Sequence, residues 1–348
     1  MIYFITRATK TYTLLTFLNT WGGRLRPLVK FLPVEKMARA TAFQPGTYIL
    51  TDYDILSDSQ VKILQDIYTE LKKHPEGFKL LNQPGISLCR IDLLEKLYSA
   101  GINPFRCLPA NNLPENLNFP VFVRKGRDHY GKITGLINDK AGLEKTIAET
   151  QKEGLAKEEI LVTEFADTSD QNGVFRKYSA FLVDDVVVPR HIFFSKKWMI
   201  KGADLVNPEY IDEEIRFLEN NPHKEELKKI FALAGINYGR IDYGMKNGKP
   251  VVWEINPNPM IASSSSLKKP KRRPAHDTFA GLFIAAFEKL NSPQTGAAVR
   301  NPLSGSFQKE VRRAFPFNPV FYRSAHLFQH LKSILLFGFY TFRNQLKK

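Results

Sequence analysis

The segment of residues 239 to 259, GRIDYGMKNGKPVVWEINPNP, constrains the fold more than any other part of the 348-residue chain. Its Asn247-Gly248 pair stands between two runs rich in Val, Ile and Tyr, which is typical of a tight turn between antiparallel strands. A three-residue loop, with Gly248 in the left-handed region, is one of the common closures and pairs Met245 with Lys249. The chain is therefore expected to contain an antiparallel sheet built around this hairpin.

Polar side chains interrupt both strands of the hairpin. The three-residue loop places Arg240 opposite Glu254, and because side chains alternate along a strand, four polar residues then share one face. They are Arg240, Asp242, Glu254 and Asn256. Two neighbouring carboxylates are costly to bury unless a cation lies between them, and oxygen ligands of this kind suit Mg²⁺. The simpler interpretation is an ion pair of both carboxylates with Arg240, and a two-residue loop would turn Asp242 to the opposite face.

Composition is that of a soluble globular protein, with 43% hydrophobic and 24% charged residues. The two cysteines, Cys89 and Cys107, offer neither a metal-binding spacing nor a disulfide framework, which favours a reducing, cytoplasmic setting. Polar residues break the apolar N-terminus before it reaches signal-peptide length, and no run attains the roughly eighteen apolar residues that a spanning helix needs.

Positive charge is concentrated at the C-terminal end. Of the net charge of +15, most lies in residues 267–348, where fifteen Lys and Arg face three acids. Such a block is usually a solvated face or tail, and less often binds an anionic partner. Residues 325–343 also carry an apolar stripe at helical spacing, which fits either packing onto the domain or a peripheral membrane contact through residues 325–348. Nucleic-acid binding has charge alone in its favour, without a recognition motif, so it is not expected.

The order of strand-like and helix-like runs predicts α/β and α+β architecture. Strands at 2–6, 47–51 and 78–82 with a helix at 57–73 predict a small doubly wound unit over residues 1–88. The following unit, 89–290, divides into a small part (about 115–165) and a large part (about 166–290), and 291–348 form a basic extension with an amphipathic helix. Within 89–290 we expect helices at 90–100, 141–152, 222–234 and 275–290, and strands at 119–125, 159–165, 177–183 and 186–192.

The hairpin resembles the ATP-grasp superfamily, in which an Arg-x-Asp strand is followed about twelve residues later by Glu-x-Asn-x-x-Pro. The matching residues are Arg240, Asp242, Glu254, Asn256 and Pro259. The resemblance covers about residues 80–290. The superfamily includes carboxylate-amine ligases such as D-alanine:D-alanine ligase and glutathione synthetase. It implies an ATP-grasp fold with an N-terminal pre-ATP-grasp domain and two α+β subdomains that clasp ATP.

The resemblance also assigns the contacts to the ATP phosphates. Arg90 and Arg124 stand where the family has phosphate-binding lysines, and Lys125 stands where it has proline. Both departures from lysine keep a cation, and arginine offers a fork that matches phosphate oxygens. Residues 126–135 correspond to the flap over the triphosphate.

The segment ILVTEFADTSD resembles the hinge that clasps adenine. By this resemblance Glu164 accepts from the adenine amino group, while the backbone of Phe165 and Ala166 reads the ring edge. Asp167 or Asp170 binds the ribose hydroxyls. Lys177 and Arg190 on the following strands complete the implied ATP contacts, although a surface salt bridge is the simpler interpretation of each charged residue taken alone.

The implied activity is ATP-dependent ligation, in which a small-molecule carboxylate is activated as an acylphosphate and attacked by an amine. Arg240 and Arg124 are the implied catalytic residues. Asp242, Glu254 and Asn256 are the implied ligands of Mg²⁺, two ions in the family, for which Mn²⁺ can substitute. Two alternatives remain open at this stage: a non-catalytic ATP-binding protein, and an ATP-grasp enzyme held peripherally at a membrane.

Overall fold

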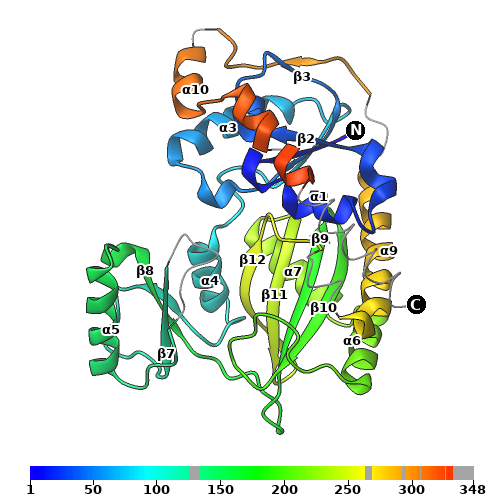
Figure 1. Cartoon of the computed structure of the whole chain (residues 1–348). Coiled ribbons are helices and arrows are strands. Elements are labelled where there is room, and N and C mark those ends of the chain that lie inside the picture. The colour runs from blue at the N-terminus through cyan, green and yellow to red at the C-terminus, as the bar shows by residue number, and fades with distance from the viewer. Residues whose placement is uncertain (126–133, 263–268, 292–294, 306, 326, 332–348) are drawn as a thin grey trace.

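The computed structural model describes residues 1–125, 134–262, 269–291, 295–305, 307–325 and 327–331. The described residues form a parallel four-stranded sheet, an antiparallel four-stranded sheet, and smaller sheets of three and two strands (Figure 1). This mixed architecture confirms the expected combination of α/β and α+β units. The domain boundaries at 88/89 and 290/291 remain a prediction.

The parallel sheet is built from the N-terminal residues and is covered on both faces. Its strands, in order across the sheet, are β2 (Val29–Pro33), β1 (Ile2–Thr6), β4 (Gly46–Leu50) and β5 (Phe78–Leu81). Successive side chains of a strand point to opposite faces. Accordingly Phe4 joins the core with α1 (Tyr12–Leu18) and α9 (Arg273–Leu290), whereas Ile5 joins the core with α2 (Val34–Ala38) and α3 (Asp58–Leu71). This is the doubly wound unit that the sequence predicts.

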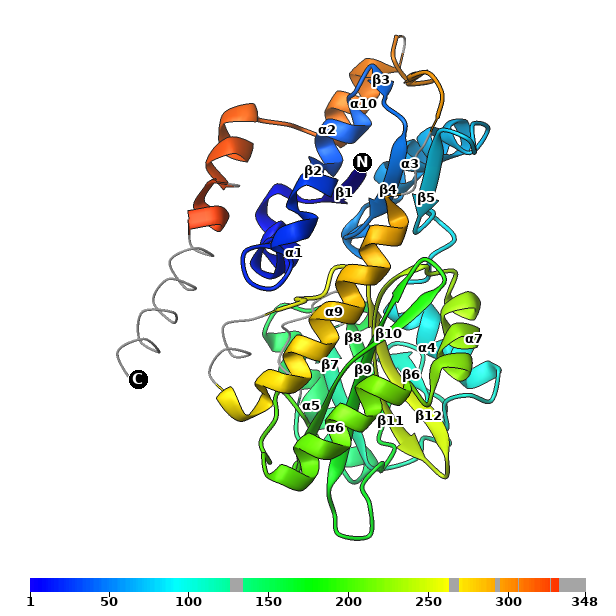
Figure 2. The same ribbon diagram turned by 90° about the vertical axis from the view of Figure 1, so that its right-hand side faces the viewer.

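The antiparallel sheet has the strand order β10-β9-β11-β12. Its strands are β9 (Phe175–Val183), β10 (Val186–Ser195), β11 (Tyr238–Lys246) and β12 (Lys249–Asn256). On one face, Ile241 packs in the same core as α7 (Lys224–Ala234). On the other face, Tyr238 packs edge-on against a phenylalanine of α9, which runs beside both large sheets (Figure 2). Arg240 and Asp242 follow Tyr238 at intervals of two, so they lie on the face that α9 shares with the cleft described below.

The loop of the β11–β12 hairpin is one residue shorter than expected. Asn247 and Gly248 both have positive φ, 51° and 74°, as a type I′ turn requires. Lys246 therefore pairs with Lys249, and the predicted three-residue loop is wrong.

A β-bulge compensates for the change of register that the shorter loop causes. The register shifts between Asp242 and Tyr243, so that Asp242 pairs with Glu254 and Arg240 pairs with Asn256. A bulge inserts one extra residue in one strand, which exchanges the faces of everything beyond it. The four polar residues therefore share a face, although by a different route from the one expected.

The three-stranded sheet has the order β6-β8-β7 and packs on one helix. Its strands are β6 (Cys107–Pro109), β7 (Val121–Lys125) and β8 (Ile160–Glu164). Val121 and Val162 join a small separate core with Leu143 and Ile147 of α5 (Lys140–Lys152). The expected flap, residues 126–135, lies outside the described residues except for its last two positions. Helix α4 (Arg90–Ser99) lies between this unit and β12 (Figure 1).

Two parts of the chain have more structure than the sequence indicated. Helix α6 (Pro208–Asn220) was not predicted, although Asn207 caps it by accepting from the Tyr210 amide, at 2.8 Å. Residues 291–324, for which no helix or strand was predicted, contain β13 (Val299–Arg300), which pairs with β3 (Ala42–Phe43), and α10 (Gln308–Ala314). Most of the apolar stripe at 325–343 lies outside the described residues, and within the described part no helix has the length and apolarity needed to cross a membrane.

Candidate functional site

A cleft of about 550 Å³ lies between the three-stranded sheet and the antiparallel sheet. Arg124, Glu164, Phe165 and Ala166 line it from one side, and Lys177, Arg240, Asp242, Glu254 and Asn256 from the other. A volume of this size suits a nucleotide-sized ligand, because small-molecule sites usually measure about 300–1,000 Å³.

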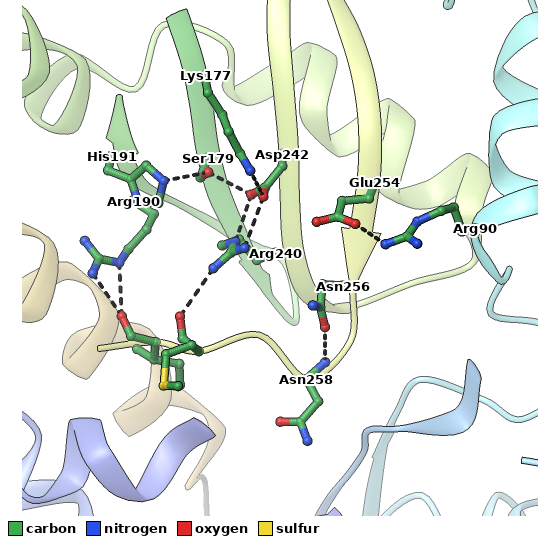
Figure 3. A network of polar contacts seen from close by, with 12 residues as sticks. Arg90, Lys177, Ser179, Arg190, His191, Arg240, Asp242, Glu254, Asn256 and Asn258 are labelled. Atoms are coloured by element: carbon green, nitrogen blue, oxygen red, sulfur yellow. Dashed lines mark hydrogen bonds and ion pairs between the residues drawn. The ribbon is translucent and has the colours of Figure 1, made fainter. Parts of the chain in front are cut away.

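The carboxylate of Asp242 is bound by three neighbouring side chains (Figure 3). Arg240 donates to both of its oxygens, at 2.8 and 3.1 Å, and Lys177 lies 2.7 Å from Oδ2. Burial alone would raise the pKa of the Asp242 carboxyl, but Arg240 and Lys177 outweigh it and hold the pKa well below its usual range. The carboxylate is therefore ionised at neutral pH.

A buried serine and histidine support Asp242 from the neighbouring strands. The Ser179 hydroxyl donates to Asp242 Oδ1 at 2.7 Å and lies 3.0 Å from Nε2 of His191. Because a hydroxyl has one proton and Ser179 donates it to Asp242, we assign the proton of the second bond to His191 Nε2. Burial, followed by the charge of Arg190, lowers the pKa of His191, which keeps the ring neutral. The histidine thus has a structural role.

Glu254 faces Arg90 from the end of β12, and the two side chains form an ion pair (Figure 3). Burial would raise the pKa of Glu254, but the cations around it, Arg90 foremost, lower it. Arg124 lies close by on β7, where burial and the charge of Arg90 lower its pKa. Its Nε is buried and has no hydrogen-bond partner among the described residues, so one donor of this guanidinium remains available for an anionic ligand.

Asn256 completes the polar face, and the segment after β12 fixes its orientation. The amide N–H of Asn258 donates to Asn256 Oδ1 at 2.9 Å. The Asn258 side chain donates in turn to Asp52 Oδ1, at 3.0 Å, and accepts from the Thr13 hydroxyl, at 2.6 Å. The loop that follows the hairpin is thus tied to the N-terminal unit.

The charges of the cleft do not balance. Arg90, Arg124, Lys177 and Arg240 surround two carboxylates, Asp242 and Glu254, which leaves a surplus of two positive charges. The third carboxylate of the lining, Glu164, is paired with Arg106 and does not change this balance. Clustered cations in a partly dry site raise the free energy of the protein unless an anion compensates them. The arrangement is therefore suited to a polyanionic ligand such as a triphosphate.

The residues of the predicted adenine hinge differ in whether they are available to a ligand. Phe165 and Ala166 line the cleft, but the carboxylate of Glu164 is bound by Arg106, whose Nε donates to it at 3.0 Å. It also accepts from the backbone amides of Arg106 and Asn118, both at 2.8 Å. Burial opposes ionisation of Glu164, but these bonds outweigh it and lower its pKa. The carboxylate of Glu164 therefore has a structural role, and its bond to the adenine amino group stays a prediction.

Four further expected ATP contacts lie away from the cleft lining. Lys125 is half-buried on β7, and Arg190 lines an adjoining chamber. Asp167 accepts from the Ser169 amide at 2.9 Å, within its own turn. Asp170 is bound by Arg176 at 2.6 Å, which lowers its pKa to about 2.

Sequence reasoning missed an aromatic wall of the cleft. Trp198 stands 5.1 Å from the ring of Phe122 and 5.7 Å from that of Phe165, measured between centroids. Trp253, the extra residue of the hairpin bulge, lines the same cleft. The only signal was the apolar run WMI inside the polar loop after β10. Aromatic faces of this kind bind flat rings by stacking.

No protein-family model and no curated protein sequence match the chain. Among solved structures, it is similar to the D-alanine–D-alanine ligase of Bacillus anthracis, with 16% identity and a TM-score of 0.46 over 83% of this chain and 96% of that one. The D-alanine–D-alanine ligase of Helicobacter pylori has 13% identity and a TM-score of 0.44, over 85% and 99% of the two chains. A RimK domain protein ATP-grasp from Sphaerobacter thermophilus has 10% identity and a TM-score of 0.42, over 81% and 98%.

The donor set of the hairpin fits Mg²⁺ in its chemistry. Asp242, Glu254 and Asn256 present carboxylate and amide oxygens, and both carboxylates are ionised. Glu254 Oε1 accepts no hydrogen bond from the described residues, whereas both oxygens of Asp242 already have two partners each. Across the described residues no three His, Cys, Asp or Glu side chains gather into a metal site. A metal would therefore need ligands from a bound phosphate, as Mg²⁺ commonly does.

Proposed function

We propose that the protein is an ATP- and Mg²⁺-dependent ligase of the ATP-grasp type, which joins a small-molecule carboxylate to an amine. The observation that carries this proposal is the polar face of the β11–β12 hairpin. Two ionised carboxylates and an amide there meet a surplus of cations inside a cleft with an aromatic wall. A nucleotide matches all three properties, since it has a flat base, a polyanionic chain and bound magnesium.

The residues take distinct parts in this proposal. Trp198 and Phe165 would hold the base, with the backbone of Phe165 and Ala166 at its edge. Arg90, Arg124 and Lys177 would contact the phosphates. Mg²⁺ would be held by Asp242, Glu254 and Asn256, and would neutralise phosphate charge when bound.

The proposed reaction has two steps. A carboxylate oxygen of the acid forms a bond to the γ-phosphorus of ATP, the bond to the bridging oxygen breaks, and ADP leaves. The amine then attacks the acyl carbon of the acylphosphate, phosphate departs with the electrons of the C–O bond, and the amine loses a proton. Negative charge moves over the phosphoryl oxygens in both steps, and the positioned guanidinium groups of Arg124 and Arg240 would stabilise it.

The substitution Glu254→Gln tests the proposal. It removes the charge that would help to hold Mg²⁺ but keeps the size of the side chain, so ADP formation with a screened acid and amine should fall by about a hundredfold or more. Glu219→Gln, on the exposed end of α6, is the matched control and should leave the rate unchanged. ADP formation by Glu254→Gln at the wild-type rate would contradict the assignment.

A nucleotide-binding protein without catalysis is the second candidate. One observation favours it: protein cations already bind Asp242 and Glu254, so the carboxylates do not depend on a metal in this arrangement. The two candidates differ in ADP release, since a binding protein retains ATP intact in the presence of any acid and amine. Cys89 and Cys107 are not joined in a disulfide, which fits a cytoplasmic setting for either.

A further inference from the structure

A second chamber of about 310 Å³ adjoins the cleft. Both spaces are lined by Lys177, Lys201, Arg240 and Met260, so these residues form a common wall. The rest of the chamber is built from β10, from the loop that follows it, from the segment after β12, and from residues 269–276 around the beginning of α9.

The lining of the chamber is strongly basic. Six of its thirteen lining residues are Lys or Arg, and none is Asp or Glu. Arg272 is neutralised by the buried Glu214, with Nε donating at 2.9 Å. Two of the three cations of the common wall, Lys177 and Arg240, share Asp242. Arg190, Lys201 and Lys269 form no ion pair with the acids that the structure describes. Lys201 is exposed and Lys269 donates to the Ala203 carbonyl, whereas the charge of the buried Arg190 is compensated by no acid among the described residues.

Arg190 is the deepest of these cations. It is 6% exposed, lies 4.2 Å above the ring of Phe279, and donates to the Ile261 carbonyl at 3.0 and 3.1 Å. Figure 3 shows that Arg190 and Arg240 both point toward the segment after β12 and each donates to it. Burial, followed by the nearby charge of Arg272, lowers the pKa of Arg190 to about 9. A guanidinium so placed gains most from an anion close to it.

His276 provides an independent indication of a ligand. Its Nδ1 lies 3.3 Å from NH1 of Arg190, and because arginine only donates, Nδ1 is the acceptor. Burial and the neighbouring arginines lower the pKa of His276 to about 2, so the ring is neutral and its proton is on Nε2. Nε2 is buried and has no hydrogen-bond partner among the described residues, although buried donors are nearly always paired. An acceptor oxygen of a ligand would satisfy it.

We propose that this chamber binds the acid substrate, and that this acid is a small molecule with at least two anionic groups. One carboxylate would lie at the common wall, beside Arg240 and Lys177, within reach of the nucleotide. The second anionic group would lie against Arg190 and His276, with Lys201 and Lys269 around it. A monocarboxylate would fill only the first position and leave the deeper cations uncompensated. The substrate class rests on the proposed function, whereas anion binding by the chamber does not.

The test is calorimetric titration of the full chain with glutarate, pentanoate and citrate, in the presence and absence of saturating MgADP. Glutarate and pentanoate share a five-carbon chain but carry two carboxylates and one. We expect glutarate and citrate to bind at least about tenfold tighter than pentanoate, since each adds a charge-assisted contact. We also expect MgADP to leave their binding in place. Equal binding of glutarate and pentanoate, or displacement of the acids by MgADP, would overturn the proposal.

Matched variants locate the binding. Arg190→Gln and Lys269→Gln should each weaken citrate binding by about tenfold or more, whereas Arg190→Lys should retain part of the affinity. Lys271 is an exposed neighbour outside the chamber, so Lys271→Gln should leave the affinity for citrate unchanged. Lys269 is half-buried, so its variant should fold even if Arg190→Gln does not. Equal effects of the Lys269 and Lys271 substitutions would show that the chamber does not bind the anion.

MgADP titrated alone reports on the nucleotide cleft. A protein that binds citrate but not MgADP would contradict the proposed function and would still support the anion site.

Discussion

At the scale of single residues, the site is determined by which charges the protein pairs and which it leaves for a ligand. Asp242 has four bonds from three partners, and Glu164 is similarly surrounded, so both are fixed parts of the structure. Arg124 and His276 each retain a buried donor without a partner among the described residues. Such unpaired donors are more informative about ligands than the charged residues alone, because native proteins rarely leave them unsatisfied.

The charge of Asp242 predicts a dependence of stability on pH. Its folded-state pKa lies below the ordinary value of 3.8, so the stability that it contributes is fully present above that value and is lost as pH falls below it. At neutral pH, Asp242→Asn leaves Arg240 and Lys177 without their counter-charge and should cost about 3 kcal/mol of unfolding free energy. The difference between variant and wild type should shrink as pH falls from about 5 to about 3, because the carboxyl of the unfolded wild-type chain then takes up a proton while the folded one stays ionised.

Urea unfolding at several pH values measures this difference. Asp185→Asn, in the exposed turn between β9 and β10, is the matched control and should stay within about 0.5 kcal/mol of wild type. A destabilisation by Asp242→Asn that stays constant over the whole range would mean that the charge of Asp242 does not contribute to stability.

At the scale of elements, the β11–β12 hairpin shows that a turn and a bulge can offset one another. The type I′ turn alone would place Glu254 and Asn256 on the face opposite to Arg240 and Asp242, and the bulge in β12 brings the four residues to one face. The turn therefore sets the register of the whole site. Substitutions at the turn should lower the unfolding free energy before they change the rate of the reaction.

A pair of glycine substitutions tests the turn. Gly248 has a φ of +74°, which a side chain disfavours, so Gly248→Ala should lower the unfolding free energy by about 1 kcal/mol. Gly281 lies on the exposed face of α9 with open space around it, so Gly281→Ala should raise that free energy by roughly 0.5–1 kcal/mol. Urea denaturation of both variants provides the comparison, and the same sign for both would refute the assigned turn conformation.

At the scale of the whole molecule, the N-terminal sheet and the hairpin are joined through Asn258. Its side-chain amide donates to both oxygens of Asp52, at 3.0 and 3.1 Å, and its backbone amide orients Asn256. The N-terminal unit therefore helps to position a residue of the cleft. Asp52 itself has a positive φ of 57°, at the end of β4.

Asn258→Ala should destabilise the protein by about 2 kcal/mol, because Asp52 and Thr13 lose buried partners. Asn258→Asp should cost more at neutral pH, since it places a second carboxylate beside Asp52. Asn220→Ala, at the exposed end of α6, is the control for these unfolding measurements. If the Ala and Asp variants are equally stable, the contact between Asn258 and Asp52 does not join the hairpin to the N-terminal unit.

Much of this fold follows from local sequence. Ser57 begins α3 through a capping box with Gln60, and the Asn247-Gly248 pair marks the hairpin, because these signals act within a few residues. The bulge at Trp253 depends on packing across strands, and the partner of Glu164 comes from 58 residues away, at Arg106. Such long-range contacts leave no periodic trace in a sequence. The polar face of the hairpin could thus be predicted, whereas the aromatic wall and the second chamber could not.

The most direct test of the account is the binding of ATP, measured by calorimetry with Mg²⁺ and again with EDTA in excess. If Asp242, Glu254 and Asn256 hold a metal that the phosphates complete, ATP should bind at least about tenfold more tightly with Mg²⁺. Arg124→Ala should weaken binding under both conditions, since the guanidinium contacts phosphate directly. An affinity that is the same with Mg²⁺ and with EDTA, or the absence of ATP binding, would contradict the central claim.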